Sequence, residues 1–247
     1  MIRPICIVAL ASFLVFGCAS VKPTVQTSER SSSILVFYKT AGYYHQSIPD
    51  GLAALQRLGS EHGIAVDTTK DGGHFTTEGL KRYDAVVFLN TTGNVLDTMQ
   101  QVAFEQYIRS GKGFVGIHSA TDTEYSWPWY NKLAGAYFSS HPHIQNARIH
   151  VVNKEHISTQ HLPDVWERKD EWYNFKDMNT GVTVLLNLDE KSYKGGTNGA
   201  SHPIAWYHSF DGGRAWYTAG GHTSESYKEP LFLQHVLGGI KYAIGNE

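Results

Sequence analysis

The stretch Gly111-Lys-Gly-Phe-Val-Gly-Ile-His118-Ser-Ala-Thr-Asp-Thr-Glu124 decides the fold of this chain. An apolar run, Phe114 to Ile117, leads to a polar tip at His118-Ser119 and then to a small acidic loop. The pattern is typical of a buried parallel strand that ends at a site, because ligands of open α/β sheets bind beyond the carboxyl ends of the strands. We therefore expect an imidazole and a hydroxyl to lie where chemistry occurs.

The residues before this stretch alternate between apolar runs and segments with helical spacing. They predict a strand at 34–38, a helix from 48 that ends near Gly63, a strand at 64–67, a short helix at 76–82, a strand at 85–89 and a helix that Gly111 stops. Asp97 with Gln100 is expected to cap this last helix, with Val102, Phe104 and Ile108 on its apolar side. Repeated strand–helix units imply parallel strands with right-handed crossovers.

After Gly135 the pattern changes to strands without long helices between them. These strands are predicted at 148–152, 182–188, 204–209 and 214–218, and the residues Phe210-Asp-Gly-Gly213 favour a hairpin between the last two. A final helix carries Phe232, Val236, Ile240 and Ile244. The fold class is therefore α/β, with a mostly parallel sheet flanked by helices and a β-hairpin in the C-terminal part.

The N-terminal residues indicate export. Residues 1–17 combine an early Arg3 with an apolar stretch too short to span a bilayer, which predicts a signal peptide. The segment Leu14-Val-Phe-Gly-Cys18 resembles a bacterial lipobox, so we expect Cys18 to carry a lipid; an ordinary signal peptide with an incidental cysteine is the alternative. Residues 18–33 then form the lipidated cysteine and a flexible tether, and 34–247 form the domain. The N-terminal sequence therefore predicts an exported bacterial lipoprotein that is anchored to a membrane.

Cysteine content and charge exclude several functions. The chain has two cysteines, Cys6 and Cys18, so the domain has no disulfide, no thiol nucleophile and no thiolate metal ligand. The net charge is −2 and no basic patch occurs, which argues against nucleic acid as a partner.

The residues Gly116-Ile-His118-Ser-Ala120 have the form of the nucleophile elbow of hydrolases and glutamine amidotransferases. His118 occupies the place of the nucleophile, and Ser119 is one residue away and is expected to point elsewhere. Hydrolysis through Ser119 is therefore disfavoured.

Five motifs in series carry a resemblance to a known family. They are Gly42-Tyr-Tyr-His45-Gln-Ser-Ile-Pro49, Gly113-Phe-Val-Gly-Ile-His118-Ser-Ala120, Asp170-Glu-Trp-Tyr173, Pro203-Ile-Ala-Trp206 and Gly220-Gly-His222. With them the chain resembles the ThuA-like family, named for trehalose utilisation. The resemblance implies a flavodoxin-like, class I glutamine amidotransferase-like fold without amidotransferase activity. It also implies a link to carbohydrate metabolism, often beside oxidoreductases that make keto-sugars.

Three histidines are expected at one edge of the sheet. His45 follows the first strand, His118 ends a central strand, and His222 follows the last strand, so a sheet that is parallel there brings them together. Neutral imidazoles with a carboxylate suit Zn²⁺ or a similar metal, and they equally suit acid–base catalysis. We predict His45, His118 and His222 as metal ligands, with His141 as a further candidate, and His118, His222 and Glu171 as catalytic residues.

The remaining predictions concern the walls of the site. Expected substrate-binding residues are His45, Tyr44, Ser119, Asp122, Trp127, Tyr173 and Trp206. Asp170 either joins Glu171 at the site or braces a loop. The remaining histidines that we assign to the surface or the core are His62, His150, His156, His161 and His235.

Three functions remain open from sequence. The first is an enzyme on a carbohydrate, namely a hydrolase, lyase or isomerase that acts on an oxidised (keto) glycoside, with sugar oxidoreductases as pathway partners. The second is a surface-anchored sugar-binding lipoprotein without turnover. The third is an amidotransferase-like scaffold that binds a partner.

Overall fold

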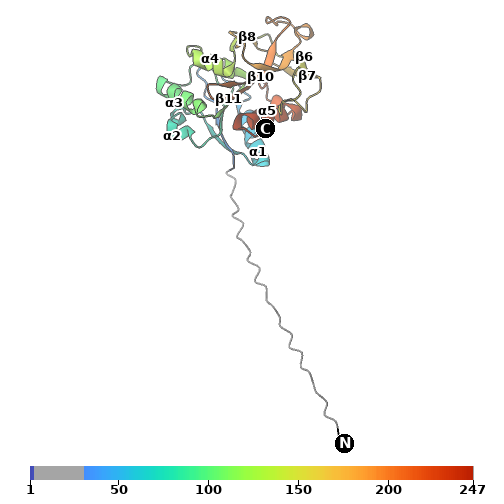
Figure 1. Cartoon of the computed structure of the whole chain (residues 1–247). Coiled ribbons are helices and arrows are strands. Elements are labelled where there is room, and N and C mark those ends of the chain that lie inside the picture. Colours follow the sequence, from blue (N-terminus) through green and yellow to red (C-terminus); the bar gives the residue numbers. More distant parts are fainter. Residues whose placement is uncertain (3–30, 247) are drawn as a thin grey trace. The chain divides into compact units, whose positions relative to one another are not determined.

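The computed structural model describes residues 1–2 and 31–246. The chain divides into two units, Met1–Arg30 and Ser31–Glu247, and the second contains all the elements below (Figure 1). The signal peptide, the lipidated Cys18 and most of the tether fall on residues 3–30 and lie outside the described residues. Among the residues that are described, no helix is both long and apolar enough to span a membrane.

A nine-stranded sheet forms the centre of the domain, in the order β2-β1-β3-β4-β11-β10-β9-β6-β7. Its first five members in this order are parallel to one another: β2 (Ala65–Thr69), β1 (Ser33–Phe37), β3 (Ala85–Leu89), β4 (Gly113–Ile117) and β11 (Gly213–Thr218). The other four extend it by antiparallel pairing: β10 (Pro203–Phe210), β9 (Thr183–Leu188), β6 (Gln145–Val151) and β7 (Val165–Asp170). Because direction reverses at each antiparallel step, β7 runs the same way as β4.

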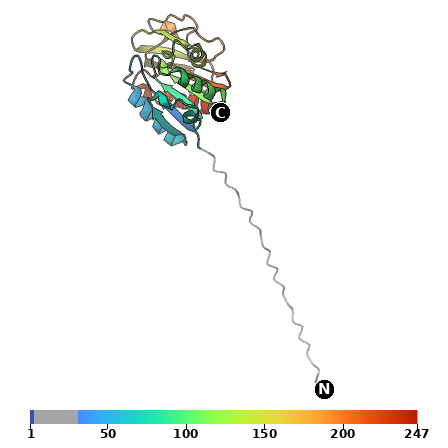
Figure 2. The same ribbon diagram turned by 90° about the vertical axis from the view of Figure 1, so that its left-hand side faces the viewer.

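Helices cover both faces of the sheet (Figures 1 and 2). One face carries α1 (Ile48–His62) and α5 (Pro230–Ile244), and the other carries α2 (Thr77–Leu80), α3 (Thr98–Arg109) and α4 (Pro128–Ala134). A small antiparallel pair, β5 (Tyr137–Ser140) and β8 (Asn174–Lys176), lies outside the main sheet. Short 3₁₀ turns are η1 (Gly72–His74), η2 (His118–Thr121), η3 (Glu190–Ser192) and η4 (Ser226–Lys228).

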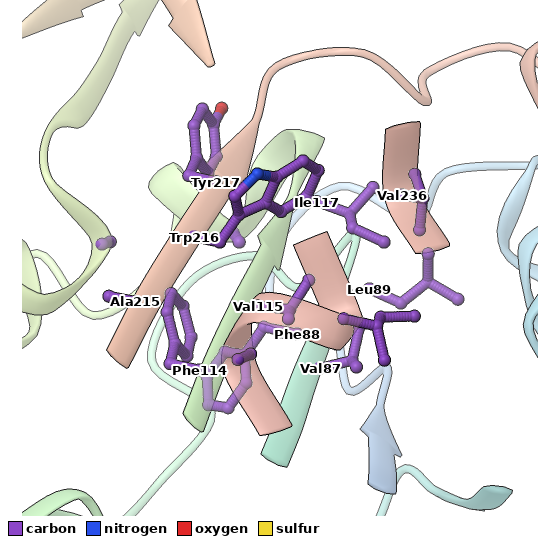
Figure 3. Packing of buried hydrophobic residues seen from close by; sticks show 14 of the residues in the cluster. Val87, Phe88, Leu89, Phe114, Val115, Ile117, Ala215, Trp216, Tyr217 and Val236 are labelled. Atoms are coloured by element: carbon purple, nitrogen blue, oxygen red, sulfur yellow. The ribbon is translucent and has the colours of Figure 1, made fainter. Parts of the chain in front are cut away.

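The core lies between the central strands and these helices (Figure 3). Every residue of β3 and β4 is buried, as expected for strands covered on both faces. The ring of Phe88 in β3 stacks on Phe104 of α3 at 5.4 Å between centroids, while Val236 of α5 packs on the opposite face. Burying such side chains stabilises the domain by about 1.5–3 kcal/mol each. Strands β3 and β4 therefore lie at the centre of the core.

The predicted fold class is confirmed: an α/β domain with a large, mostly parallel sheet flanked by helices. The capping box of Asp97 and Gln100 begins α3, and the hairpin of β10 and β11 turns at Asp211 and Gly212, whose φ angles are 49° and 92°. Two positive φ values are what the tightest hairpin turns require.

Some elements differ from the prediction. Val102 of α3 was expected on the apolar side of its helix and is instead 45% exposed, whereas Phe104 and Ile108 are buried. Elements α4, β5, β7 and β8 were not predicted from the sequence. Strand β7 was not predicted because two of its buried positions hold the charged residues Arg168 and Asp170. Its sequence therefore lacks the alternation of apolar and polar residues that marks a half-buried strand.

Candidate functional site

The three predicted histidines meet because the strands that carry them are parallel. Thr218 at the end of β11 lies opposite Ile117 at the end of β4, so His118 and His222 leave the same edge of the sheet. His45, in the segment between β1 and α1, reaches the same edge: its ring centroid lies 4.8 Å from that of His118 and 5.1 Å from that of His222.

His118 occupies an elbow at the end of β4. Its φ of 51° is the left-handed conformation that a nucleophile elbow imposes, and a 3₁₀ turn follows in place of a longer helix. Tyr217 donates a hydrogen bond to the His118 carbonyl at 2.7 Å, which braces the turn. Nδ1 of His118 donates to the carbonyl of Ala219 at 2.8 Å, so the lone pair of a neutral imidazole is on Nε2. The elbow thus presents a buried, oriented nitrogen.

Glu171 completes a compact cluster with these histidines. Its Oε2 atom lies 3.0 Å from Nδ1 of His222 and 3.5 Å from Nε2 of His118, and those two nitrogens are 3.2 Å apart. With His45 included, one ligand atom from each of the four side chains lies within 4.8 Å of all the others. Neighbouring ligands of one cation are about 3–3.5 Å apart when each bond is about 2.0–2.2 Å. The atoms of Glu171, His118 and His222 therefore have the spacing of ligands that could share one cation, and the four-residue set with His45 is more widely spaced.

Burial and neighbouring groups shift the pKa values of two side chains of the cluster. Burial, aided by the nearby His118 and His222, lowers the pKa of His45 to about 2, so this imidazole is neutral near pH 7. Burial alone would raise the pKa of the Glu171 carboxyl, but its interactions with the adjacent His118 and His222 outweigh burial and hold that pKa well below its ordinary value. A neutral imidazole and an ionised carboxylate are the forms that bind metal.

Asp170 holds the last strand's turn in place and does not face the cavity. Its carboxylate accepts hydrogen bonds from the backbone N–H groups of Gly221 at 2.9 Å and His222 at 3.2 Å, and it pairs with the buried Arg168 at 3.2 Å. Gly221 has a φ of 111°, a conformation that L side chains rarely adopt. Of the two alternatives left open for Asp170, the structure favours the bracing role. Arg168, which supports Asp170, was not predicted from the sequence.

A cavity of about 330 Å³ opens onto the cluster. Its lining consists of Tyr43, His45, Asp122, Phe138, His141, Glu171, Tyr173 and His222. Nδ1 of His141 lies 3.0 Å from Oε1 of Glu171, which brings this histidine to the site. His118 is fully buried behind the lining, and the centroid of its ring is 4.1 Å from that of Tyr173. A hollow of about 570 Å³ over β6 and β7 is larger but lies away from these groups, so volume alone does not select the site.

Several predicted wall residues lie elsewhere. Tyr44 is absent from the lining of the cavity, whereas its neighbour Tyr43 is present. Ser119 is buried beneath His45, with its Oγ atom 3.4 Å from Nδ1 of that histidine. Phe138 was not predicted at all, since nothing in its sequence neighbourhood distinguishes it from a core residue.

Trp127 and Trp206 are core residues in place of the predicted substrate-binding ones. Trp206 is completely buried, donates from Nε1 to the carbonyl of Ala134 at 2.9 Å and stacks on Tyr217. Trp127 is 8% exposed and donates to Glu105. An indole enclosed on all sides cannot stack on a ligand. Five further histidines lie on the surface or in the core, as expected: His62, His150, His156, His161 and His235.

A family profile described as trehalose utilisation, ThuA, matches residues 33–243. The chain belongs to the ThuA family. This confirms the resemblance carried by the five sequence motifs. A comparison with curated proteins gives no match.

Solved structures agree with the ThuA assignment. The chain is 26% identical to a ThuA-like protein from Bacteroides uniformis, with a TM-score of 0.76 over 90% of this chain and 95% of the other. A ThuA-like protein from Parabacteroides merdae is 17% identical, with a TM-score of 0.73 over 88% and 91% of the two chains. A β-galactosidase from Bacillus circulans sp. alkalophilus is 12% identical, with a TM-score of 0.59 over 87% of this chain and 31% of the other. The last two likenesses show the fold alone.

Proposed function

We propose that this ThuA-family protein is a carbohydrate enzyme whose centre is a single divalent cation held by His45, His118, His222 and Glu171. The observation that carries the proposal is the approach of Glu171 Oε2, His118 Nε2 and His222 Nδ1 to within 3.0–3.5 Å of one another at the floor of a cavity. Imidazole and carboxylate donors of this kind suit Zn²⁺ and similar ions.

The surroundings of the four side chains support this reading. The Ala219 carbonyl accepts a hydrogen bond from Nδ1 of His118, and the Ser119 hydroxyl contacts Nδ1 of His45, so a neighbouring group orients each of these two rings. Metal-binding histidines are held in this way. Asp170 positions the backbone of His222 by accepting a hydrogen bond from its N–H group. The cluster is therefore preorganised by its neighbours.

The proposed substrate is a keto-glycoside. A keto group acidifies the adjacent C–H bond, so a base can remove that proton and the glycosidic oxygen can then leave. A bound divalent cation would polarise the carbonyl as a Lewis acid. The aromatic side chains of Tyr43, Phe138 and Tyr173 would pack against the sugar ring, and the cavity of about 330 Å³ accommodates a small ligand. Hydrolase, lyase and isomerase activity differ only in the steps after proton removal.

The proposal extends to the place of action. On the sequence of residues 1–18 we propose export and lipid attachment at Cys18, which would hold the enzyme at a membrane. Oxidoreductases that generate keto-sugars would then be its partners in a reaction sequence.

Elemental analysis of the purified protein, paired with turnover of a keto-glycoside, tests the proposal. We expect about one equivalent of a divalent metal and measurable product, both strongly reduced in His118→Ala and Glu171→Gln. His143→Ala, an exposed histidine from the loop that also carries His141, is the matched control and should keep both. A metal-free wild-type protein with full turnover would contradict the metal centre and favour acid–base catalysis by the side chains alone. Saccharide binding by calorimetry without product would favour the sugar-binding alternative.

A further inference from the structure

Proton transfer at this site requires a titratable group that is not a ligand of the proposed cation. If His45, His118, His222 and Glu171 direct their lone pairs at a cation, they are unavailable as bases. Four of the other residues that line the cavity can titrate: Tyr43, Asp122, His141 and Tyr173. His141 already contacts Glu171 through Nδ1 at 3.0 Å. Among the described residues that line the cavity and are not proposed ligands, Asp122 is thus the one carboxylate.

Asp122 is held rigidly and presents one free oxygen. Its backbone N–H donates to Ser119 at 2.8 Å, and its carbonyl accepts from Gly93 at 2.8 Å. The Tyr125 hydroxyl donates to Oδ1 at 2.6 Å and lies 3.1 Å from the Phe138 carbonyl. Among the described residues, no side chain or backbone group donates a hydrogen bond to Oδ2. The carboxylate therefore has one oxygen positioned by protein and one left for a ligand.

The environment of Asp122 suits a base. Burial raises the pKa of its carboxyl, and the hydrogen bond from Tyr125 opposes this rise only in part. The other charged or titratable groups that face it are His118 from η2, His141 from the segment between β5 and β6, and Lys176 from β8. A raised carboxyl pKa moves the base toward the operating pH, where proton transfer is most efficient.

We propose that Asp122 is the proton acceptor of this enzyme and that Tyr125 is its positioning residue; the assignment rests on the proposed function. In the step, a C–H bond breaks on the carbon atom that joins the carbonyl carbon to the glycosidic carbon, and its proton passes to Oδ2 of Asp122. The electron pair forms a carbon–carbon double bond as the glycosidic C–O bond breaks. The protonated Asp122 then returns the proton to the leaving oxygen. No further reactant is needed, because the proton removed from carbon equals the proton delivered to oxygen.

Asp122→Asn tests the assignment in the full-length, metal-loaded protein with a keto-glycoside as the probe. We expect turnover to fall about 100-fold or more, while metal content stays at the wild-type level and substrate affinity by calorimetry changes by no more than about threefold. Exchange of the substrate C–H for deuterium in D₂O, followed by NMR, should fall in parallel. Ser126→Ala, an exposed neighbour of Tyr125, is the matched control.

Tyr125→Phe separates a positioning role from a structural one. Loss of its hydrogen bond removes an influence that lowers the Asp122 pKa, so the acidic limb of the pH profile of turnover should move to higher pH. Unchanged turnover in Asp122→Asn, or lost substrate affinity with turnover preserved at saturation, would overturn the assignment while leaving the metal-dependent function intact. A wild-type protein that converts no keto-glycoside would overturn both proposals.

Discussion

The carboxylate of Asp170 accepts a hydrogen bond from the backbone N–H of His222 at 3.2 Å. Asp170 ends the outermost strand, β7, and His222 follows the central strand β11, so this contact joins the antiparallel extension to the parallel core. The same carboxylate is fully buried and pairs with Arg168. The backbone that presents His222 is therefore supported from a distant strand.

Asp170→Ala should destabilise the domain strongly. The substitution leaves three backbone N–H groups and the Ser226 hydroxyl without their acceptor. It also leaves Arg168 without one of its two carboxylate partners, Glu229 being the other. We expect a loss of about 3 kcal/mol or more in the free energy of unfolding, measured with urea at pH 7.5. Asp164→Ala, which removes an exposed ion pair with Lys154, should cost no more than about 1 kcal/mol. Equal losses in the two variants would contradict the bracing role.

Ser119→Ala distinguishes two roles for the hydroxyl. Its long contact with Nδ1 of His45 makes it a group that orients a metal ligand, so we expect metal affinity to fall about tenfold with turnover retained at saturating metal. Competition with a chromophoric chelator measures the affinity. If Ser119 were instead the nucleophile, turnover would vanish at any metal concentration.

Gly221→Ala should displace His222. The added Cβ atom would lie 2.8 Å from the Tyr227 hydroxyl and 3.0 Å from Ile117, and φ is 111°. Gly199→Ala is the matched control, because its φ of 82° is also positive but nothing lies within 4 Å of the new atom. Strain alone should cost about 1–2 kcal/mol in the control. The Gly221 variant should lose more stability and also its metal, read out by thermal unfolding and elemental analysis, whereas equal effects would exclude a close-packing requirement at Gly221.

Acid should destabilise the fold through buried histidines. Burial lowers the pKa of His235 from 6.5 to about 3. Below about pH 6.5 the His235 imidazole therefore binds a proton in the unfolded chain but stays neutral in the folded chain. The contribution of neutral His235 to the free energy of unfolding is therefore fully present above pH 6.5. It is lost as the pH falls toward 3, at up to about 1.4 kcal/mol per pH unit.

Urea unfolding of the chelated protein between pH 7.5 and pH 5 measures this slope for wild type and for His235→Gln. The variant should be less stable at pH 7.5, because its contacts with Ser158 and Thr218 change, but its slope should be shallower. Parallel slopes for the two proteins would show that His235 does not titrate as argued.

Most of the fold was predictable because apolar runs and helical spacing are local signals. The runs that became β1, β3 and β4 are buried on both faces, and the elbow at His118 follows from a polar tip on such a run. Strand β7 was not predictable, since its inward residues Arg168 and Asp170 are charged and only the finished structure pairs them.

The sequence by itself determined the parallel core and the strand ends that carry His45, His118 and His222. Glu171 was also a candidate from sequence, but only the tertiary structure decided that it lies beside these histidines, because an even number of antiparallel steps turns the end of β7 toward the same edge of the sheet. It also decided that Trp127 and Trp206 are enclosed in the core while Tyr43 and Phe138 line the cavity. The physical reason is that burial and proximity depend on strand register and on how loops close over long sequence distances, and neither is encoded in a local pattern.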